Sequence, residues 1–292
     1  MKTENKINNI PETKSLFKTV LKKNNFFLIT GAAIVILNFI ISLTTPFLPL
    51  PSFKDYNFEQ RYETPSLSSP FGRDENGADV MTLVFWGSRV SLTVAICVVS
   101  ITTILGLIIG SIAGYFGGKI DFFIMRFIDM IYAFPGFLLA LAMVAALGPS
   151  VRNLILAMSI TGWAGVARLV RGEILHLKEK EYIQSAISVG NSAFRIITVH
   201  IWPNLIGVMT VQCTFAMAGT LIVESGLSFL GLGAPPTTPT WGMLLNSGRY
   251  YLVEAPHISI FPGLAILMLV LGFNLLGDGL REILDPKSRT LK

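Results

Sequence analysis

Charged side chains divide the chain into apolar runs separated by polar segments. A helix needs roughly 20 consecutive apolar residues to cross the hydrocarbon core of a bilayer. Most of the runs approach or exceed this length, and the fourth is short. The pattern predicts an all-α fold, a polytopic membrane helix bundle with six transmembrane helices. The predicted spans are Phe26–Leu43, Val90–Gly118, Met130–Val151, the run between Arg152 and Arg168, Ile201–Val223 and Ala255–Gly277.

The composition agrees with a membrane protein. Of the 292 residues, 52% are hydrophobic and only 14% are charged, and the mean hydropathy is +0.61. Because a soluble domain averages about 25% charged residues, this chain has too few charges to cover a surface that faces water. The net charge of +5 does not indicate a nucleic-acid partner, since the basic residues lie in loops beside the apolar runs. Cys97 and Cys213 fall inside apolar runs without CxxC spacing, so they are expected to be small buried side chains.

The basic residues also predict the orientation. Residues 1–25 form a polar, lysine-rich tail, and Phe26–Leu43 is followed by Thr44, Thr45 and Pro46 rather than by a small-residue cleavage site, so an uncleaved first span is predicted. Six spans place both termini on one side, and with that side cytoplasmic 17 of the 23 lysines and arginines lie inside, which the positive-inside rule favours. The chain is therefore expected to be a multi-pass protein of the cell membrane with both termini cytoplasmic. The inner set is Lys2, Lys6, Lys14, Lys18, Lys22, Lys23, Lys119, Arg126, Arg168, Arg171, Lys178, Lys180, Arg195, Arg281, Lys287, Arg289 and Lys292, and the outer set is Lys54, Arg61, Arg73, Arg89, Arg152 and Arg249.

Two polar segments are too long for plain turns. The extracytoplasmic segment, residues 44–89, is rich in proline and is not expected to fold alone. The cytoplasmic segment Arg168–His200 has apolar residues at helical spacing and reads as two short amphipathic helices broken around Gly190 and Asn191. The expected organisation is a tail (1–25), a first span (26–43), the outer segment (44–89), a five-helix core (90–280) with a cytoplasmic loop at 171–203, and a second tail (281–292).

The cytoplasmic amphipathic loop has two possible environments. It can lie on the membrane surface or bury its apolar face in a partner protein. Glu173, Glu179 and Glu181 weaken the first alternative, because anionic membrane surfaces repel them. A protein partner is therefore the preferred interpretation.

This loop resembles the EAA motif of ABC-importer permeases. The motif has Glu-Ala-Ala, a glycine four residues after the second alanine, and Leu-Pro thirteen residues after that glycine. In this chain Ala186 holds the place of the second alanine, Gly190 that of the glycine and Pro203 that of the proline. Gln184 and Ser185 replace Glu-Ala, and Trp202 replaces the leucine, so the match is imperfect.

Three further stretches narrow the resemblance to the dipeptide, oligopeptide and nickel branch of these permeases, and to its subunit with the longer N-terminal extension. Phe71–Asp79 looks like the branch's signature before the second span. Glu224–Gly233, followed by Pro235-Pro236 and Trp241-Gly242, looks like its exit from the fifth span. Leu284-Asp285-Pro286 is similar to its usual ending. The resemblance implies a type I ABC-importer permease architecture.

The same resemblance implies the function and the partners. Such a subunit pairs with a second, homologous permease subunit and two ATPase subunits, sits in membrane lipid, and receives cargo from an extracytoplasmic substrate-binding protein. The chain is not expected to be an enzyme or to hold a cofactor, since it has no GxxxxGK[ST] and ATP and Mg would be bound by the partner subunits. The expected cargo is short peptides, with nickel or a metal chelate as the alternative.

The candidate site residues follow from the motif and from charges at membrane depth. The expected ATPase-coupling residues are Glu181, Tyr182, Ser185, Ala186, Gly190 and Pro203. Gly190 is expected to take a positive φ and end the first short helix, while Pro203 is expected near the first turn of the fifth span, where a missing N–H costs little. No catalytic or metal-ligating residue is predicted.

Glu224 is the most informative single residue, because no charged residue lies within 20 positions of it on either side. A carboxylate at membrane depth usually faces a bundle interior or a water-filled path. It is either a translocation-path or gate residue, or an acid held by amides of the glycine-rich Ser225–Gly233 exit, and the second interpretation is slightly favoured. Asp121, Arg126 and Asp129 open the third span, where an ion pair along the helix is expected and an inner-gate brace is the alternative. Pro135 and Pro262 are expected to kink the third and sixth spans.

Two other function classes fit parts of the sequence. An intramembrane serine protease would use Ser228, in Gly226-Leu-Ser228-Phe229, with His257 as base, but rhomboid proteases need a small residue where Phe229 stands. A secondary transporter would need several acids near the midplane and usually an internal repeat, and only Glu224 is available. Both are weaker than the ABC-importer interpretation.

Overall fold

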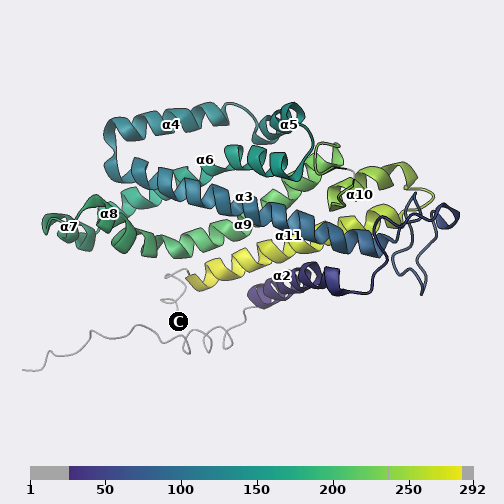
Figure 1. Cartoon of the computed structure of the whole chain (residues 1–292). Coiled ribbons are helices and arrows are strands. Elements are labelled where there is room, and N and C mark those ends of the chain that lie inside the picture. Colours follow the sequence, from purple (N-terminus) through teal and green to yellow (C-terminus); the bar gives the residue numbers. More distant parts are fainter. Residues whose placement is uncertain (1–25, 236, 285–292) are drawn as a thin grey trace, which may run out of the picture.

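The computed structural model describes residues 26–235 and 237–284, and the described residues are almost entirely helical (Figure 1). Five helices are each long and apolar enough to cross a membrane, and counting the bent pair α4 and α5 as one span brings the number to six. The predicted all-α bundle of six spans is confirmed on this count. The helices are α2 Phe26–Thr44, α3 Val80–Phe116, α4 Gly118–Tyr132, α5 Gly136–Leu147, α6 Val151–Lys178, α7 Glu181–Ser188, α8 Ala193–Arg195, α9 Trp202–Phe229, α10 Trp241–Gly248 and α11 His257–Leu284.

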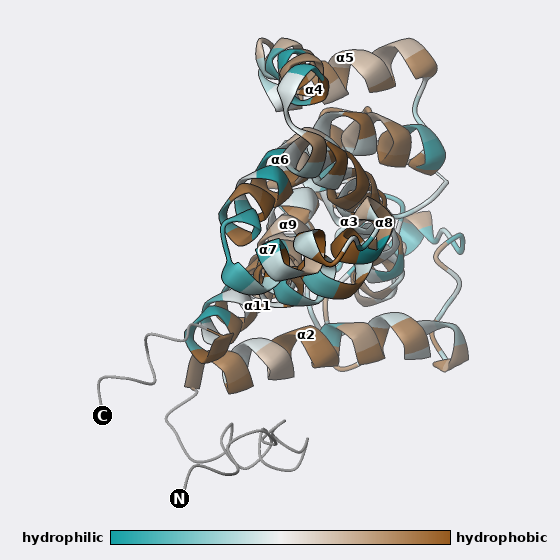
Figure 2. Ribbon diagram, turned by 90° about the vertical axis from the view of Figure 1, so that its left-hand side faces the viewer, coloured by the Kyte–Doolittle hydropathy of each residue, from teal (hydrophilic) through white to brown (hydrophobic). Residues whose placement is uncertain are grey.

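The long helices run side by side, and different short elements lie at their two ends. The short helices α7 and α8 lie at one end, and α10 lies at the other end with the irregular outer segment between Leu48 and Asp79 (Figure 1). The start of α2 and the end of α11 both point toward the α7 end. Figure 2 places α2 at one edge of the bundle and α4 and α5 at the opposite edge, with hydrophobic positions over most of α2 and α5.

Glycines set the close packing of these helices. On α3, Gly106, Gly110 and Gly114 recur every four residues and face α6; a Cβ added at Gly110 would lie 2.5 Å from the carbonyl oxygen of Ala167. On α2, a Cβ at Gly31 would lie 2.8 Å from the carbonyl oxygen of Gly272 on α11. Small residues at such crossings let membrane helices approach closely, where van der Waals contact rather than the hydrophobic effect drives association. The first and last spans, α2 and α11, are therefore held to each other by close backbone packing.

Helix α3 begins ten residues before the predicted start of the second span. Helix α3 begins at Val80 rather than Val90, because Asp79 caps it: its Oδ2 accepts from the amide and the hydroxyl of Thr82, each at 2.8 Å. An N-cap carboxylate satisfies an amide that has no partner within the helix. Arg89 therefore lies on the helix, with its guanidinium 5.1 Å from the ring centre of Trp86, and the outer segment ends before it.

The other predicted boundaries shift outward in the same way. Helix α6 runs from Val151 to Lys178, ten residues beyond the predicted limit at Arg168. Helix α11 continues to Leu284 rather than ending at Gly277, with Pro262 inside it. The third span is a broken pair, α4 and α5, bent by 78°. The break falls at Pro135, which cannot donate a backbone hydrogen bond, so the predicted kink is confirmed and is sharp.

Pro203 is the second residue of α9, so its predicted place near the first turn of this helix is confirmed. The helical path nevertheless starts earlier, since it is continuous from Ala193 to Phe229. A π-helical turn, Ile196–Ile201, precedes α9, and the Trp202 amide donates to the Ile197 carbonyl five residues back. Widening the helix by one residue is a known way to accommodate a proline ring and its missing N–H.

Some predictions fall outside the described residues. These are the N-terminal tail 1–25 with its lysines, Pro236, and the C-terminal stretch from Asp285 with its basic residues and its family-like ending.

Candidate functional site

The loop at 171–203, which the sequence predicts to be cytoplasmic, forms the end of the molecule that carries α7. Helix α7 covers Glu181–Ser188, and Gly190 follows with φ +85°. The Gly190 amide donates to the Ile187 carbonyl at 2.9 Å, and the Asn191 amide donates to the Ala186 carbonyl at 3.3 Å. This pair of bonds is a Schellman motif, in which a left-handed residue closes a helix. The predicted positive φ and helix-ending role of Gly190 are therefore present.

The two faces of α7 differ. Ile183 is fully buried in a cluster with Ile174 of α6 and with Ile196 and Ile201 of the π turn. On the other side, Tyr182 is 45% exposed and Val189 83% exposed. Glu181 and Ser185 are exposed as well, and the Ser185 hydroxyl donates to the Glu181 carbonyl at 2.9 Å. A short helix anchored by one isoleucine thus presents a mixed apolar and polar face away from the bundle.

Side-chain hydrogen bonds fix this loop to the long helices. Lys178 Nζ donates to the Tyr115 carbonyl at 2.8 Å, at the end of α3. Trp202 Nε1 donates to the Ser111 hydroxyl at 3.0 Å, also on α3. Gln184 Nε2 donates to the Lys178 carbonyl at 2.7 Å and caps α6. Two departures from the EAA pattern, Gln184 and Trp202, therefore make bonds that the motif's glutamate and leucine cannot make.

Ion pairs between α4 and α6 lie toward the same end. Arg171 contacts Asp121 through two nitrogens, with Nη2 to Oδ2 at 2.6 Å, and Arg168 Nη2 donates to Asp129 at 2.8 Å. The predicted pair along the helix, Arg126 with Asp129, is present but longer, at 3.8 Å between exposed side chains. The stronger pairs cross between helices, which sequence spacing within one helix does not reveal.

Glu224 is completely buried, with 0% of its surface exposed. It lies inside α9, because this helix continues past the predicted end at Val223 to Phe229. Its carboxylate accepts from three hydroxyls: Ser91 on α3 at 3.0 Å, Ser228 at 2.9 Å and Ser225 at 3.4 Å. The expected loop amides are not its partners, and the cluster instead ties α9 to α3 across 133 positions in the sequence.

A groove along the membrane-spanning part is lined by small and polar residues that the sequence interpretation missed. It has a volume of about 330 Å³ and lies between α3, α5, α6 and α9. Its polar side chains are Thr102, Thr161, Gln212 and Thr220, and its glycines are Gly136, Gly162, Gly165 and Gly219. The signal available in the sequence was the uncharged but polar Gln212 within an apolar run.

The outer stretch Phe71–Asp79 is a compact turn. Gly77 has φ +73°, and a side chain there would collide with the backbone of Asn57. Asp74 Oδ1 accepts from the amides of Asn76 and Ala78, at 2.9 and 2.7 Å. Phe71 stacks on Phe261 of α11, with ring centres 4.0 Å apart. The turn therefore attaches the outer segment to the start of α3 and to α11.

The family-like pair Trp241-Gly242 also has a packing role. Trp241 is buried, and its Nε1 donates to the Val84 carbonyl on α3 at 2.9 Å. Gly242 lies against α9, where a Cβ would come within 2.8 Å of Ser225 Cα. Helix α10 is thus wedged between α3 and the end of α9.

The residues considered for a protease do not form a pair. Ser228 donates to Glu224, and His257 Nε2 lies 3.0 Å from the Arg73 carbonyl. Among the described residues no hydrogen bond joins Ser228 to His257. The described residues also contain no group of three or more His, Cys, Asp or Glu side chains placed to hold a metal ion.

Comparison with known proteins identifies similar chains. Residues 106–290 match the family described as binding-protein-dependent transport system inner membrane component. A dipeptide transport system permease protein of Alkalihalophilus pseudofirmus is 40% identical over 270 residues, covering 92% of this chain and 88% of the relative. A glutathione transport system permease protein of Pectobacterium atrosepticum is 41% identical over 243 residues, covering 83% and 81%, and that of Escherichia coli is 42% identical over 259 residues, covering 88% and 86%.

Proposed function

This chain belongs to the family of binding-protein-dependent transport system inner membrane components, as the membrane permease subunit of an ATP-driven importer, and we propose that its cargo is short peptides. Support comes from the relatives named for dipeptide transport and for transport of the tripeptide glutathione. Nickel or a metal chelate ranks second, because neither of these relatives is named for it. The chain performs no catalysis of its own in this proposal, which agrees with relatives that are transport permeases.

The proposed assembly contains a second homologous permease subunit, two ATPase subunits and an extracytoplasmic binding protein. One observation that supports a second permease is the open groove between α3, α5, α6 and α9, whose mainly apolar wall carries a few polar side chains such as Gln212 and which is not closed by this chain. A second subunit facing it would complete a translocation path. ATP and Mg are bound by the ATPase subunits.

The proposed orientation places the α7 end in the cytoplasm, with both termini on that side. The excess of basic residues in the loops and tails assigned to that side supports this arrangement. The α10 end, with the outer segment, then faces the binding protein.

Helix α7 is the proposed contact with an ATPase subunit. The observation that carries this proposal is an exposed face on α7, including Tyr182, on a helix anchored by Ile183. The flanking Lys178 of α6 and Trp202 of α9 each bond to α3. Because these attachments join α7 to α3, α6 and α9, movement of α7 on ATPase closure displaces the long helices together. Pro203 follows the π turn that links α8 to α9. The Ala186 carbonyl accepts a hydrogen bond of the Schellman motif that ends α7.

Glu224 has a proposed structural role. Its three serine hydroxyl donors satisfy the buried carboxylate and join α9 to α3 at the α10 end of the path. Ser228 also lines a pocket of about 680 Å³ that opens at the α10 end, so the cluster is adjacent to space that cargo can occupy.

The cargo proposal is tested by uptake into cells that lack this chain and cells that carry it again on a plasmid. Radiolabelled Ala-Ala and radioactive nickel are supplied separately. Restored uptake of Ala-Ala alone supports the peptide proposal, and restored uptake of nickel alone contradicts it. A partner ATPase made inactive by substitution must abolish the restored uptake; if it does not, a secondary transporter is indicated.

A further inference from the structure

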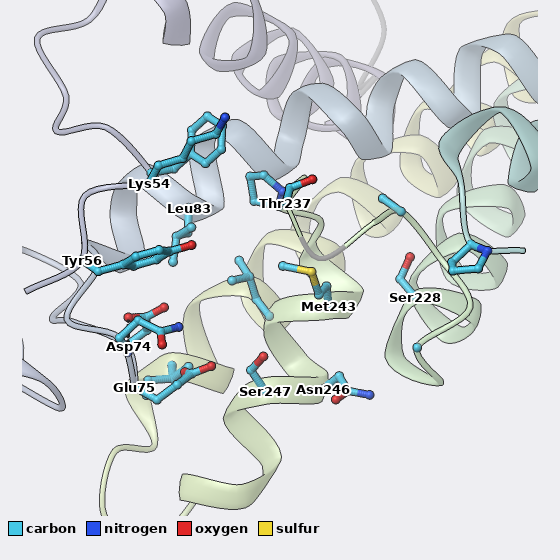
Figure 3. A pocket seen from close by; sticks show the side chains of 18 residues that line it. Lys54, Tyr56, Asp74, Glu75, Leu83, Ser228, Thr237, Met243, Asn246 and Ser247 are labelled. Atoms are coloured by element: carbon cyan, nitrogen blue, oxygen red, sulfur yellow. Dashed lines mark hydrogen bonds between the residues drawn. The ribbon is translucent and has the colours of Figure 1, made fainter. Parts of the chain in front are cut away.

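A pocket of about 680 Å³ opens at the α10 end, between the outer segment, α3, the end of α9, α10 and α11 (Figure 3). This volume lies within the range of about 300–1,000 Å³ that is usual for small-molecule sites. Apolar side chains such as Leu83, Met243 and Ile258 form part of its wall, and a few polar groups converge on it. It is separate from the groove along the membrane-spanning part.

Two adjacent carboxylates, Asp74 and Glu75, lie on one side of this pocket (Figure 3). Asp74 is only 6% exposed, and both of its backbone hydrogen bonds end on Oδ1. Glu75 Oε2 is buried without a hydrogen-bond partner. Burial and the neighbouring Glu75 charge raise the pKa of Asp74 to about 6, and no lysine or arginine of the described residues forms an ion pair with either acid.

Lys54, a cationic side chain, also lines this pocket. Lys54 and the acidic pair lie on opposite sides of the Tyr56 ring (Figure 3). Lys54 has no ion-pair partner among the described residues, and its amine lies 5.7 Å from the ring centre of Phe53. The lining of the pocket thus carries two carboxylates on one side of the Tyr56 ring and the exposed Lys54 on the other.

We propose that this pocket binds the free short peptide as a zwitterion, with the peptide ammonium at Asp74 and Glu75 and its carboxylate at Lys54. A buried carboxylate pair without a cation is costly, and a ligand ammonium supplies both the charge and the donors that these oxygens lack. Tyr56 provides an apolar and aromatic surface for the backbone between the two charged ends. This inference rests on the proposed peptide cargo and adds a binding station for it within this subunit, in a pocket that Ser228 also lines from the opposite side (Figure 3).

The test measures peptide binding to the purified complex of both permeases and both ATPases in nanodiscs, without the binding protein. Equilibrium dialysis compares radiolabelled Ala-Ala, N-acetyl-Ala-Ala and Ala-Ala amide. The unmodified complex is expected to bind Ala-Ala about tenfold more tightly than either blocked peptide, since each blocked end loses one charged hydrogen-bonded contact.

The variants assign each end of the ligand. Glu75→Gln is expected to lower Ala-Ala affinity about tenfold and to remove the preference over N-acetyl-Ala-Ala while keeping the preference over the amide. Lys54→Gln is expected to do the reverse. Glu59→Gln is the matched control, because Glu59 is an exposed acid of the same outer segment that does not line the pocket.

Three results contradict the inference. If both variants bind all three peptides as the unmodified complex does, the pocket is not a peptide site. If the unmodified complex binds no peptide, but the variants weaken stimulation of ATPase activity by the binding protein, the acidic pair instead receives a basic side chain of that protein. If the unmodified importer takes up peptide and both variants take it up at the same rate, the inference about this pocket fails and the proposed function stands. If the unmodified importer takes up no peptide, the proposed function is wrong.

Discussion

Replacing Gly190 isolates the part of the loop that closes α7. Gly190 has φ +85°, and a Cβ added there would meet nothing within 4 Å. A substitution therefore costs backbone strain and not a steric collision with neighbouring atoms. The left-handed region costs an L-residue roughly 1–2 kcal/mol, less for Asn and more for β-branched residues.

The size of this strain sets a graded expectation. A change of 1.4 kcal/mol shifts an equilibrium about tenfold, and α7 is held mainly by Ile183 and the Schellman bonds of Gly190 and Asn191. Peptide uptake is expected to fall in the order Gly, Asn, Ala, Val at position 190, with the valine variant reduced roughly tenfold. ATPase activity stimulated by the binding protein is expected to fall in parallel.

The assay is uptake of Ala-Ala into proteoliposomes that contain the complete importer, with the complex quantified by co-purification of the ATPase subunits. Gly172→Ala is the control, because Gly172 is a helical glycine of α6 with open space around it and no positive φ. If Gly190→Val transports at the unmodified rate and co-purifies normally, the closing turn of α7 has no part in coupling.

Three other perturbations test separate parts of the structure. Glu224→Leu leaves three buried serine hydroxyls without their acceptor and is expected to lower the stability of the complex by about 1–3 kcal/mol in thermal unfolding. Glu224→Gln retains one acceptor oxygen and is expected to assemble normally; a changed cargo preference in this variant would instead indicate a path role. Gly110→Ala places a Cβ 2.5 Å from the Ala167 carbonyl oxygen and is expected to destabilise the complex by roughly 1–3 kcal/mol. The control Gly172→Ala is expected to be neutral or slightly stabilising. Equal melting temperatures for the two variants would contradict the close packing of α3 on α6. The pKa of Asp74 is raised from 3.8 to about 6, so the folded state holds this proton more tightly than the unfolded state does. The stabilisation that protonated Asp74 gives the folded protein, up to about 3 kcal/mol, is complete below pH 3.8 and is lost as the pH rises through about 6. Asp74→Asn is expected to remove this dependence in thermal unfolding measured across that range, and an unchanged pH profile would contradict it.

The sequence predicted the helical class, the number of spans and the position of the turn at Gly190, because these depend on local features: charge-free runs, helical spacing and a residue that tolerates positive φ. The helix ends were less accurate. Charged residues such as Arg89 and Arg168 were taken as limits of the spans, yet a helix continues past a membrane boundary where a cap or a neighbouring helix supports it. Asp79 followed by Thr82 was a visible cap signal for the true start of α3.

The partners of the buried acid could not be predicted from one sequence. Ser91 is 133 positions from Glu224, and no periodicity links them. The same holds for Arg171 with Asp121, which lie 50 positions apart on different helices. Contacts of this kind depend on how the long helices pack, and that packing is set by glycines whose role is visible only in three dimensions, such as Gly110.

The outer pocket depends on packing in the same way. Lys54, Asp74 and Ser228 come from segments far apart in the chain, and only the folded outer segment brings them to one cavity. The sequence marked Phe71–Asp79 as a family-like stretch but gave no indication that its acids face a pocket.

The proposed contact between α7 and an ATPase subunit is tested most directly by site-specific crosslinking. A photoreactive amino acid at Tyr182, on the exposed face of α7, is irradiated in the membrane-embedded importer, with the same group at Ile206, an exposed residue of α9, as the control. Position 182 is expected to crosslink to an ATPase subunit, and position 206 is not. Crosslinking of position 182 to lipid alone would contradict the assignment of α7 as the ATPase contact.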